Sequence, residues 1–519
     1  MLWVWVAIYC AIMILFGFIT KKWSSEASGY IVADRDQGTF VNAVGMAAIL
    51  IAGTGASMFV SIGYSIGMTA HWWATGWAIA MLLGALFFGP LMRRIGCWTE
   101  LEALGVMFDS KVRVVGAAAM SLGLTFSPLA NILGSALMIK GLTGLPVEQG
   151  IIIMAVVTGI YVVLGGLWAT LLTDLVQWIL AILGFCVALP LWMYFTNGFD
   201  YFANLPKTAF NMGAEGFLPW ISWTMPSVFG LFWMMFMLVI AGGYWHRAVA
   251  GRSEKSVTKA WLLSILLALP FGFLMPLGGM YLKARGIVLD NPTVALGTIF
   301  SYMPSSLSAL GLVAVFAATM STAEAGMVAG ASIFSRDIYG RLINKTASEK
   351  DLVKVSRIVV IIYAILSVVG GIYFYHYTPV LGPALGLAAL SSFGAIIAPI
   401  LIGSFYWRWA SKEGAFFGVL IGTIFSIVFL LFTDLWEIYH PQYVSFLVSG
   451  GVFSIINIIV RYTGPWWQSS LDLNEPENTS NGSRVLNAFT EIRLLARLML
   501  LTSASWFAKY EDIQQKLNI

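Results

Sequence analysis

Three side chains with oxygen atoms lie close together in a stretch that is otherwise small or apolar. Ser321, Thr322 and Glu324 occur in FAATMSTAEAGMVAGASIFSRDIYG, residues 316–340. On a helix, Ala318 lies on the same face as the two hydroxyls, one turn earlier. Hard cations take hydroxyl and carbonyl oxygens as ligands, but Ser and Thr on such a face also bond to neighbouring membrane helices. The stretch therefore predicts either a cation site or a contact between helices.

Glu324 needs a separate explanation. A charged side chain at the centre of a bilayer costs roughly 3 kcal/mol on insertion scales, so it should be paired, protonated or bound to a cation. Three interpretations of Glu324 stay open. It is a cation ligand, a group that takes up and releases a proton, or a structural hydrogen-bonding partner while protonated.

Composition places these residues in a membrane. The chain has 519 residues, of which 59% are hydrophobic and 10% charged, and its mean hydropathy is +0.84. Soluble domains carry about 25% charged residues. Backbone polar groups in lipid must bond within their own segment, which favours an all-α integral membrane protein. The net charge of +4 comes from loop residues and does not indicate nucleic acid as a partner.

Apolar runs of bilayer length predict about thirteen membrane-spanning helices. We expect the first run to be a retained helix rather than a cleaved signal peptide. Because Gly and small residues run through 40–66 and 306–335, we expect bends or breaks in both. The predicted spans are 2–20, 40–66, 71–92, 113–140, 148–165, 170–197, 220–243, 258–283, 306–335, 354–377, 380–407, 413–433 and 441–461.

The positive charges predict the orientation. Lys and Arg gather in the loops after spans one, three, seven, nine and eleven, and such loops face the cytoplasm. We therefore expect a multi-pass protein of the cell membrane, with its N-terminus outside and its C-terminus in the cytoplasm. The loop residues are Lys21, Lys22, Arg35, Arg93, Arg94, Lys111, Arg113, Arg247, Arg252, Lys255, Lys259, Arg336, Arg341, Lys345, Lys350, Arg408 and Lys412.

Two further stretches carry polar signals within or beside apolar runs. In ILIAGTGASMFVSIGYSIG, residues 49–67, Gly53 and Gly55 flank Thr54. An interrupted helix there would free carbonyls for Na⁺, and close helix packing explains the glycines equally well. In GGLWATLLTDLVQWIL, residues 165–180, Asp174 begins an apolar run, which favours a solvated loop position over a place near a cation pathway.

Four motifs in order resemble the sodium:solute symporter family, which includes the sodium–glucose, sodium–proline and sialic acid symporters. The resemblance covers roughly residues 20–465, and HRAVAGRSEKSVTKA is also similar to a basic loop of the family. The four motifs are SGYIVADRDQGTFVNAVG, GGLWATLLTDLVQ, AATMSTAEAGMVAGASIFSRDIYGR and YWRWASKEGAFFGVLIG.

The resemblance implies a leucine-transporter-type fold with two inverted five-helix repeats and peripheral helices. Spans two to six and seven to eleven would form the repeats, and the first and sixth core helices would be broken. The implied organisation is a peripheral helix and loop in 1–39, the core in 40–410, peripheral helices in 411–465 and a cytoplasmic tail in 466–519. The tail contains basic and apolar residues at helical spacing, which suits an amphipathic helix on the membrane or one packed on the protein.

The resemblance also implies ion sites. It makes Ser321 and Thr322 side-chain ligands of one Na⁺. It assigns carbonyl ligands to Ala318, Ile51 and Thr54, and a gap in the comparison would move the last two to Ala56 and Phe59. Some relatives hold a second Na⁺ with the aspartate that matches Asp174 and two hydroxyls. Those hydroxyl positions are Glu324 and Ala325 here, so we do not expect a second site of that composition, although Asp174 and Glu324 remain a candidate cation or proton site.

The implied solute site is uncharged in this sequence. Relatives that bind sialic acid have an arginine near the position of TFSPLAN, and here there is none. Aromatic and thioether side chains suit an apolar or cationic solute instead. For HWWATGW we expect Trp72 and Trp73 at the membrane interface and His71 in an external loop. The candidate solute-binding residues are Met58, Phe59, Trp77, Ser127, Trp233 and Met237.

The sequence thus predicts a symporter, not an enzyme, that couples inward Na⁺ movement to uptake of a small organic solute by alternating access. The alternative is a solute sensor of the same fold with little transport. The expected partners are the solute, Na⁺ and the lipid bilayer, with no nucleic acid; the sequence predicts no oligomeric state.

Overall fold

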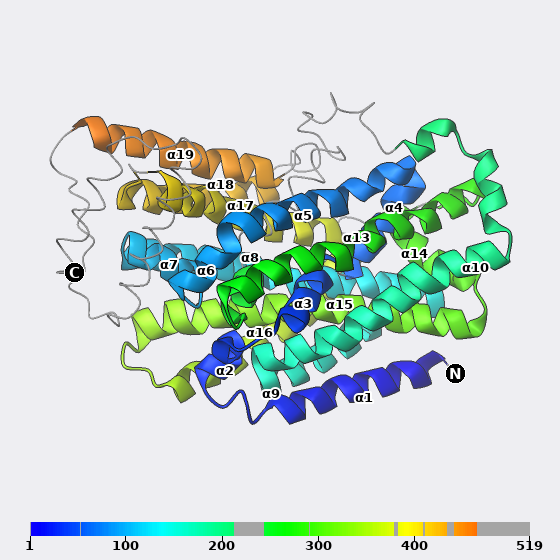
Figure 1. The fold of residues 1–519 in the computed structure, drawn as a ribbon, viewed down its shortest axis with the longest axis horizontal. Coiled ribbons are helices and arrows are strands. Elements are labelled where there is room, and N and C mark those ends of the chain that lie inside the picture. The colour runs from blue at the N-terminus through cyan, green and yellow to red at the C-terminus, as the bar shows by residue number, and fades with distance from the viewer. Residues whose placement is uncertain are drawn as a thin grey trace.

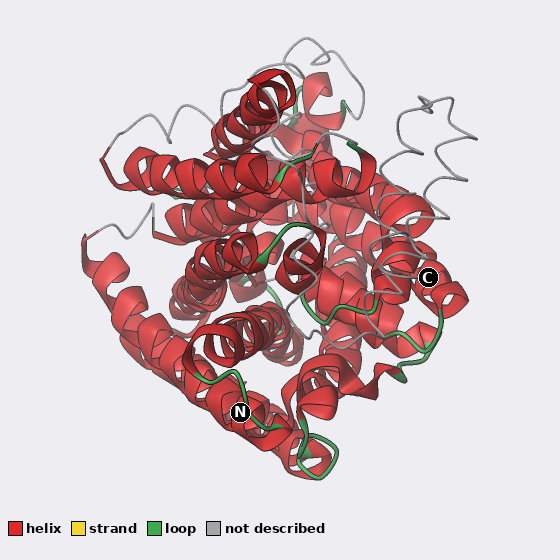
Figure 2. Ribbon diagram, turned by 90° about the vertical axis from the view of Figure 1, so that its left-hand side faces the viewer, coloured by secondary structure: helices red, strands yellow, loops and turns green. Residues whose placement is uncertain are grey.

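Long apolar helices lie side by side along the longest dimension of the molecule (Figure 1), and an end-on view shows them as a bundle (Figure 2). The computed structural model describes residues 2–51, 53–211, 243–289, 291–377, 382–407, 410–432 and 441–463. Within these ranges the chain is helical without a named strand, and nine stretches are long and apolar enough to cross a membrane.

The helices of the first half alternate long spans with short turns. In chain order they are α1 (Leu2–Thr20), α2 (Ala27–Val32), η1 (Ala33–Arg35), α3 (Thr39–Ile51), α4 (Gly53–Ile66), η2 (Gly67–His71), α5 (Trp72–Leu83), η3 (Gly84–Phe88), α6 (Gly89–Ile95), α7 (Glu100–Met107), α8 (Ser110–Thr143), α9 (Val147–Ala181), η4 (Ile182–Ala188), α10 (Leu189–Phe195), η5 (Gly198–Asn204) and η6 (Lys207–Phe210).

The second half follows the same pattern. Its helices are α12 (Gly243–Ala250), α13 (Glu254–Ala284), η8 (Pro292–Val294), α14 (Ala295–Ser301), α15 (Ser305–Ile333), the π-helical η9 (Phe334–Ile343), α16 (Glu349–Tyr377), α17 (Gly382–Tyr406), α18 (Lys412–Phe432) and α19 (Pro441–Thr463). Most of the predicted span 220–243 and the tail 466–519 lie outside the described residues. The total of thirteen spans and the division into domains therefore stay predictions.

Glycine marks one predicted boundary between spans. Gly166 has a φ of 49° and kinks α9 into two helices. A Cβ at this position would lie 2.5 Å from the Tyr30 carbonyl oxygen, so both the backbone angle and the space require glycine. The kink falls between the predicted spans 148–165 and 170–197, which accounts for two spans within one continuous helical stretch.

The two glycine-containing spans are described to different extents. The span 40–66 is helical on both sides of residue 52, which lies outside the described residues, so the expected bend or break there stays a prediction. The expectation of a break in 306–335 was wrong, since α15 is continuous from Ser305 to Ile333. Its small residues instead allow close packing: a Cβ at Gly326 would lie 2.6 Å from the Ser127 hydroxyl on α8.

The helix α15 is the central element. It packs against α8 and α9, and on another side against α3 and α4, while α13 packs against α3 and α4. The helix α1 packs mainly on α9 and also contacts α15, while α18 and α19 pack on α17 and on each other, and α18 also contacts α8 (Figure 1). Every residue of α15 from Gly311 to Ile333 is buried.

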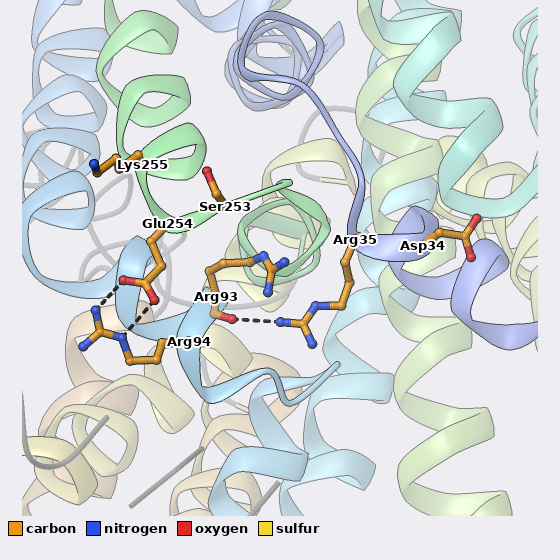
Figure 3. Close-up of a pocket in the computed structure, with 7 residues that line it drawn as sticks. All are labelled: Asp34, Arg35, Arg93, Arg94, Ser253, Glu254 and Lys255. Carbon is orange, nitrogen blue, oxygen red and sulfur yellow. Dashed lines mark hydrogen bonds and ion pairs between the residues drawn. The ribbon is translucent and has the colours of Figure 1, made fainter. Parts of the chain in front are cut away.

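Basic segments that are far apart in the sequence meet at one end of the bundle. A pocket of about 720 Å³ lies where η1, the end of α6 and the start of α13 come together. Figure 3 shows the residues that line it. The Arg35 guanidinium donates to the Arg93 carbonyl at 2.9 Å, and Arg94 pairs with Glu254. These arginines bind protein groups, so they join the three segments to one another.

A second cluster of charges at this end is buried. Arg113 pairs with Asp337 at 2.7 Å and Arg336 pairs with Glu102 at 2.8 Å. The Arg336 guanidinium also lies 4.0 Å from the centre of the Trp98 ring. The cluster joins α7 to α8 and η9. Burial alone would raise the pKa of Glu102, but the charges of Arg336 and Arg113 lower it to about 2.

We expect Glu102→Gln to lower the free energy of unfolding by about 3 kcal/mol, because it leaves the largely buried Arg336 without its carboxylate. The loss of stability is measured by heating the detergent-solubilised protein and monitoring the remaining folded fraction by size-exclusion chromatography. The matched control is Glu148→Gln, which breaks a more exposed pair with His376 and should change stability little. Equal effects of the two variants would contradict a stabilising role for the buried cluster.

Candidate functional site

The two hydroxyls of α15 face the end of α3. The Ser321 hydroxyl lies 3.4 Å from the Ala48 carbonyl oxygen and 2.9 Å from that of Ala318. The Thr322 hydroxyl lies 3.4 Å from the Ile49 carbonyl oxygen. Hydroxyl hydrogen bonds usually measure about 2.7–2.8 Å, so the two contacts to α3 are long. Five oxygens therefore gather between two helices without being fully committed to one another.

The carbonyls that these hydroxyls approach lie in the last described turn of α3, just before residue 52, which is outside the described residues. With the Ala318 carbonyl, two hydroxyls and three carbonyls lie together here. Such a group of oxygens is the environment that a hard cation requires.

The two hydroxyls approach the carbonyls of Ala48 and Ile49, which the sequence did not single out. The resemblance implied the carbonyls of Ile51 and Thr54, or of Ala56 and Phe59 after a gap, as ligands of the ion. That assignment stays a prediction, because it depends on where the gap is set in a run of glycines and small residues.

Glu324 faces a different neighbour. Its carboxylate is fully buried and lies 3.1 Å and 3.2 Å from the Thr173 hydroxyl of α9. Because that hydroxyl also approaches the Ala169 and Thr170 carbonyls at 3.0 Å, its single proton is shared. Glu324 interacts electrostatically with Asp174, the residue that follows Thr173. The helices α15 and α9 thus bring two carboxylates into one buried cluster.

Asp174 is not in a solvated loop, which corrects the interpretation favoured by the sequence. It lies within α9 and is completely buried. The Arg247 guanidinium donates to its carboxylate at 2.7 Å. Arg247 is itself 1% exposed, so it is not a free loop cation either. The residues around Asp174 are apolar because this turn of α9 lies inside the protein. The partner Arg247 is 73 positions later in the chain, so the pairing left no local signal in the sequence.

A glycine of α3 makes room for this ion pair. A Cβ at Gly45 would lie 2.9 Å from the Arg247 Nε atom and 3.1 Å from an Asp174 carboxylate oxygen. The pair therefore lies where α3, α9 and α12 meet. With both carboxylates ionised, the charges of Asp174, Glu324 and Arg247 sum to −1, which leaves a requirement for one more positive charge.

The described solute-binding candidates are buried and uncharged. The Phe59 ring meets the Trp73 ring edge-on at 6.3 Å, and the Trp77 indole donates to the Tyr244 hydroxyl at 2.6 Å. Met58 is half-buried, and Ser127 is buried against Gly326. Trp233 and Met237 lie outside the described residues. Tyr244 was missed because it precedes the basic HRAVAGRSEKS motif, which drew attention to charge instead.

Two expectations for HWWATGW were wrong. Trp73 is 2% exposed and so is not at the membrane interface. His71 is 5% exposed, and its ring stacks on Phe273 at 5.2 Å instead of lying in an external loop. Aromatic residues mark interfaces only when they face lipid, and here η2 and α5 turn both side chains inward.

The sequence has recognisable relatives. The model of the sodium:solute symporter family matches residues 30–422. High affinity choline transporter 1 of Homo sapiens is 27% identical over 390 residues, which cover 68% of this chain and 64% of that protein. The sodium/glucose cotransporter of Vibrio parahaemolyticus is 24% identical over 488 residues, covering 84% of this chain and 85% of that one.

Solved structures share the fold. A Na⁺-coupled sialic acid symporter in a substrate-bound, outward-open state has a TM-score of 0.74 at 17% identity, covering 88% of this chain and 98% of that one. A nucleobase-cation-symport-1 family transporter in a closed conformation has a TM-score of 0.51 at 16% identity, covering 93% and 98%. These likenesses confirm the predicted all-α, leucine-transporter-type fold.

We expect Arg247→Gln to destabilise the protein by about 3–5 kcal/mol, because it leaves Asp174 buried without a countercharge. The double variant Asp174→Asn/Arg247→Gln should recover much of this loss. The measurement is the yield and thermal stability of monodisperse protein. If the double variant is no better than the single one, the loss does not come from the unpaired carboxylate.

Proposed function

Because the chain belongs to the sodium:solute symporter family, whose members are transporters and not enzymes, we propose that it couples inward Na⁺ movement to uptake of a small organic solute. The family match covers residues 30–422 and therefore includes both halves of the helical core. The observation that carries the proposal is the pair of adjacent hydroxyls on α15 facing backbone carbonyls of α3.

The proposed Na⁺ site uses the hydroxyls of Ser321 and Thr322 with nearby carbonyls. Ala318 supplies one carbonyl from α15, and Ala48 and Ile49 offer two from α3. An ion there would link two helices that are far apart in the sequence. Bound Na⁺ would favour the arrangement in which α3 and α15 are close, and its release would accompany their separation during alternating access.

For the solute we propose a neutral or cationic small molecule. Support comes from the candidate positions Met58, Phe59, Trp77 and Ser127, none of which is charged. The buried Arg247 is already held by Asp174, so it is not available to bind a carboxylate solute. Because two relatives are described as high-affinity choline transporters, choline is the first solute to test. Counterflow of labelled choline in proteoliposomes would distinguish transport from the sensor alternative, which the family match does not favour.

We propose that the basic end of the bundle faces the cytoplasm, which puts the N-terminus outside and the C-terminus inside the cell. Arg35, Arg93, Arg94 and Lys255 meet at this end, and positively charged loops stay in the cytoplasm. Labelling of Lys207→Cys, at the opposite end, by a membrane-impermeant reagent from outside would support this orientation. If the reagent does not label that cysteine from outside, the opposite orientation holds.

We propose a stoichiometry of one Na⁺ per solute, with Glu324 as a coupling residue. Asp174 is neutralised by Arg247, and Ala325 offers no side-chain oxygen, which argues against a second Na⁺ held in the manner of relatives. Glu324 is left to bind a cation, exchange a proton or act as a protonated hydrogen-bonding partner. Reversal potentials in proteoliposomes measure the ratio of Na⁺ to solute, and a ratio of two would contradict this stoichiometry.

We expect Ser321→Ala and Thr322→Ala each to raise the Na⁺ concentration for half-maximal uptake by roughly tenfold, since each removes an oxygen ligand of a charged species. The measurement is choline uptake against Na⁺ concentration in proteoliposomes. Ser332→Ala is the matched control, because that buried hydroxyl of α15 donates to the Val328 carbonyl one turn earlier within its own helix. Normal Na⁺ dependence in both site variants would refute the proposed Na⁺ site.

The variant Glu324→Gln separates the three roles of Glu324, because it removes the charge and keeps the shape. If Glu324 binds a cation or titrates, Glu324→Gln should change the Na⁺ or pH dependence of uptake while the protein still folds. The measurement is uptake against pH at fixed Na⁺.

The companion variant Thr173→Val removes the hydroxyl next to Glu324 without changing charge. A purely structural hydrogen bond predicts a loss of stability in Thr173→Val and superimposable pH curves for wild type and Glu324→Gln. That result would reject the coupling role.

A further inference from the structure

A groove at the basic end of the bundle combines positive charge with apolar walls. It has a volume of about 330 Å³ and lies between the start of α8, the end of η9 and the first turns of α18. Its charged residues are Lys111, Arg341 and Lys345, and its apolar walls include Val114, Leu342 and Phe416. None of its described lining residues is acidic.

The two lysines have no competing partner within the part of the chain that the structure describes. Both are exposed, and neither Lys111 nor Lys345 forms an ion pair or hydrogen bond there. The nearby acid Asp109 caps α8 by accepting from the Val112 N–H at 2.9 Å. The pocket of Figure 3 differs, because Arg94 is paired with Glu254 and Arg35 donates to a backbone carbonyl.

The groove also lies beside exposed apolar surface. Leu342 is 60% exposed and Ile343 66% exposed at the end of η9, and Phe417 is 42% exposed at the start of α18. Lysines next to exposed apolar side chains at the end of membrane-spanning helices match the two parts of a lipid, an anionic headgroup and acyl chains.

We propose that this groove binds the headgroup of an anionic phospholipid from the leaflet that faces it. Lys111 and Lys345 contact the phosphate from two sides, with Arg341 in the same wall. The acyl chains lie along Leu342 and Phe417. A free anion would gain the charge contacts without the apolar ones, which is why a lipid fits better than inorganic phosphate.

The test is native mass spectrometry of the full-length protein titrated with phosphatidylglycerol or with phosphatidylcholine of identical acyl chains. Wild type should retain phosphatidylglycerol preferentially. The double variant Lys111→Gln/Lys345→Gln should weaken that retention by about 25-fold, at roughly fivefold for each lysine near an anionic surface. The control Lys21→Gln/Lys255→Gln removes two exposed lysines elsewhere at this end and should leave the retention of phosphatidylglycerol unchanged.

The variant Lys111→Arg/Lys345→Arg should retain the lipid, since it keeps both charges. Equal retention by wild type and the Lys→Gln double variant would overturn the proposal, as would displacement of the lipid by inorganic phosphate.

Discussion

An arginine and two carboxylates share one buried cluster in this membrane protein, and several helices are arranged around it. Arg247 reaches Asp174 from α12 at 2.7 Å, and Glu324 approaches the same turn of α9 from α15. A charge that is left unpaired inside a membrane is costly, so these helices cannot separate freely. Gly45 of α3 completes the arrangement by leaving space beside the ion pair. The relative positions of α3, α9, α12 and α15 thus depend on one electrostatic requirement.

The same helix serves the charge cluster and the proposed Na⁺ site. On α15, Ser321 faces the end of α3, and Glu324, three residues later, faces α9. Residues three apart point in neighbouring but different directions on a helix, which lets one helix contact both partners. A movement of α15 or α3 that alters the Na⁺ site would therefore also act on the contact between α15 and α9. The proposed Na⁺ site and the charge cluster are separated by one turn of α15, so coupling between them could act through that turn alone.

The sequence predicted features of the structure that depend on neighbouring residues, and it did not predict those that depend on pairing between distant residues. Apolar runs predicted the limits of most described helices because bilayer thickness fixes their length, and Gly166 kinks α9 where a boundary was expected. The spacing of Ser321 and Thr322 predicted either a cation site or a contact between helices, and both hydroxyls approach carbonyls of α3. The burial of Asp174 could not be predicted, since its partner Arg247 belongs to a motif that indicates a basic loop. The particular carbonyls that the hydroxyls approach could not be predicted either, because backbone oxygens have no residue-specific signature.

The proposed stoichiometry has a consequence for the solute that such a protein could concentrate. Moving one elementary charge across 100 mV yields about 2.3 kcal/mol. With one Na⁺ and a neutral solute, the membrane potential alone would support roughly 50-fold accumulation, at about 1.4 kcal/mol for each factor of ten. With one Na⁺ and a singly charged cationic solute, two charges move and the potential contributes about 4.6 kcal/mol, or roughly 2,000-fold. A positive charge on the solute would therefore supply the same electrical driving force as a second Na⁺, without the contribution of that ion's concentration gradient. A ratio of one Na⁺ per solute is thus compatible with strong accumulation of a cationic solute, whereas a neutral solute would be accumulated less by the membrane potential.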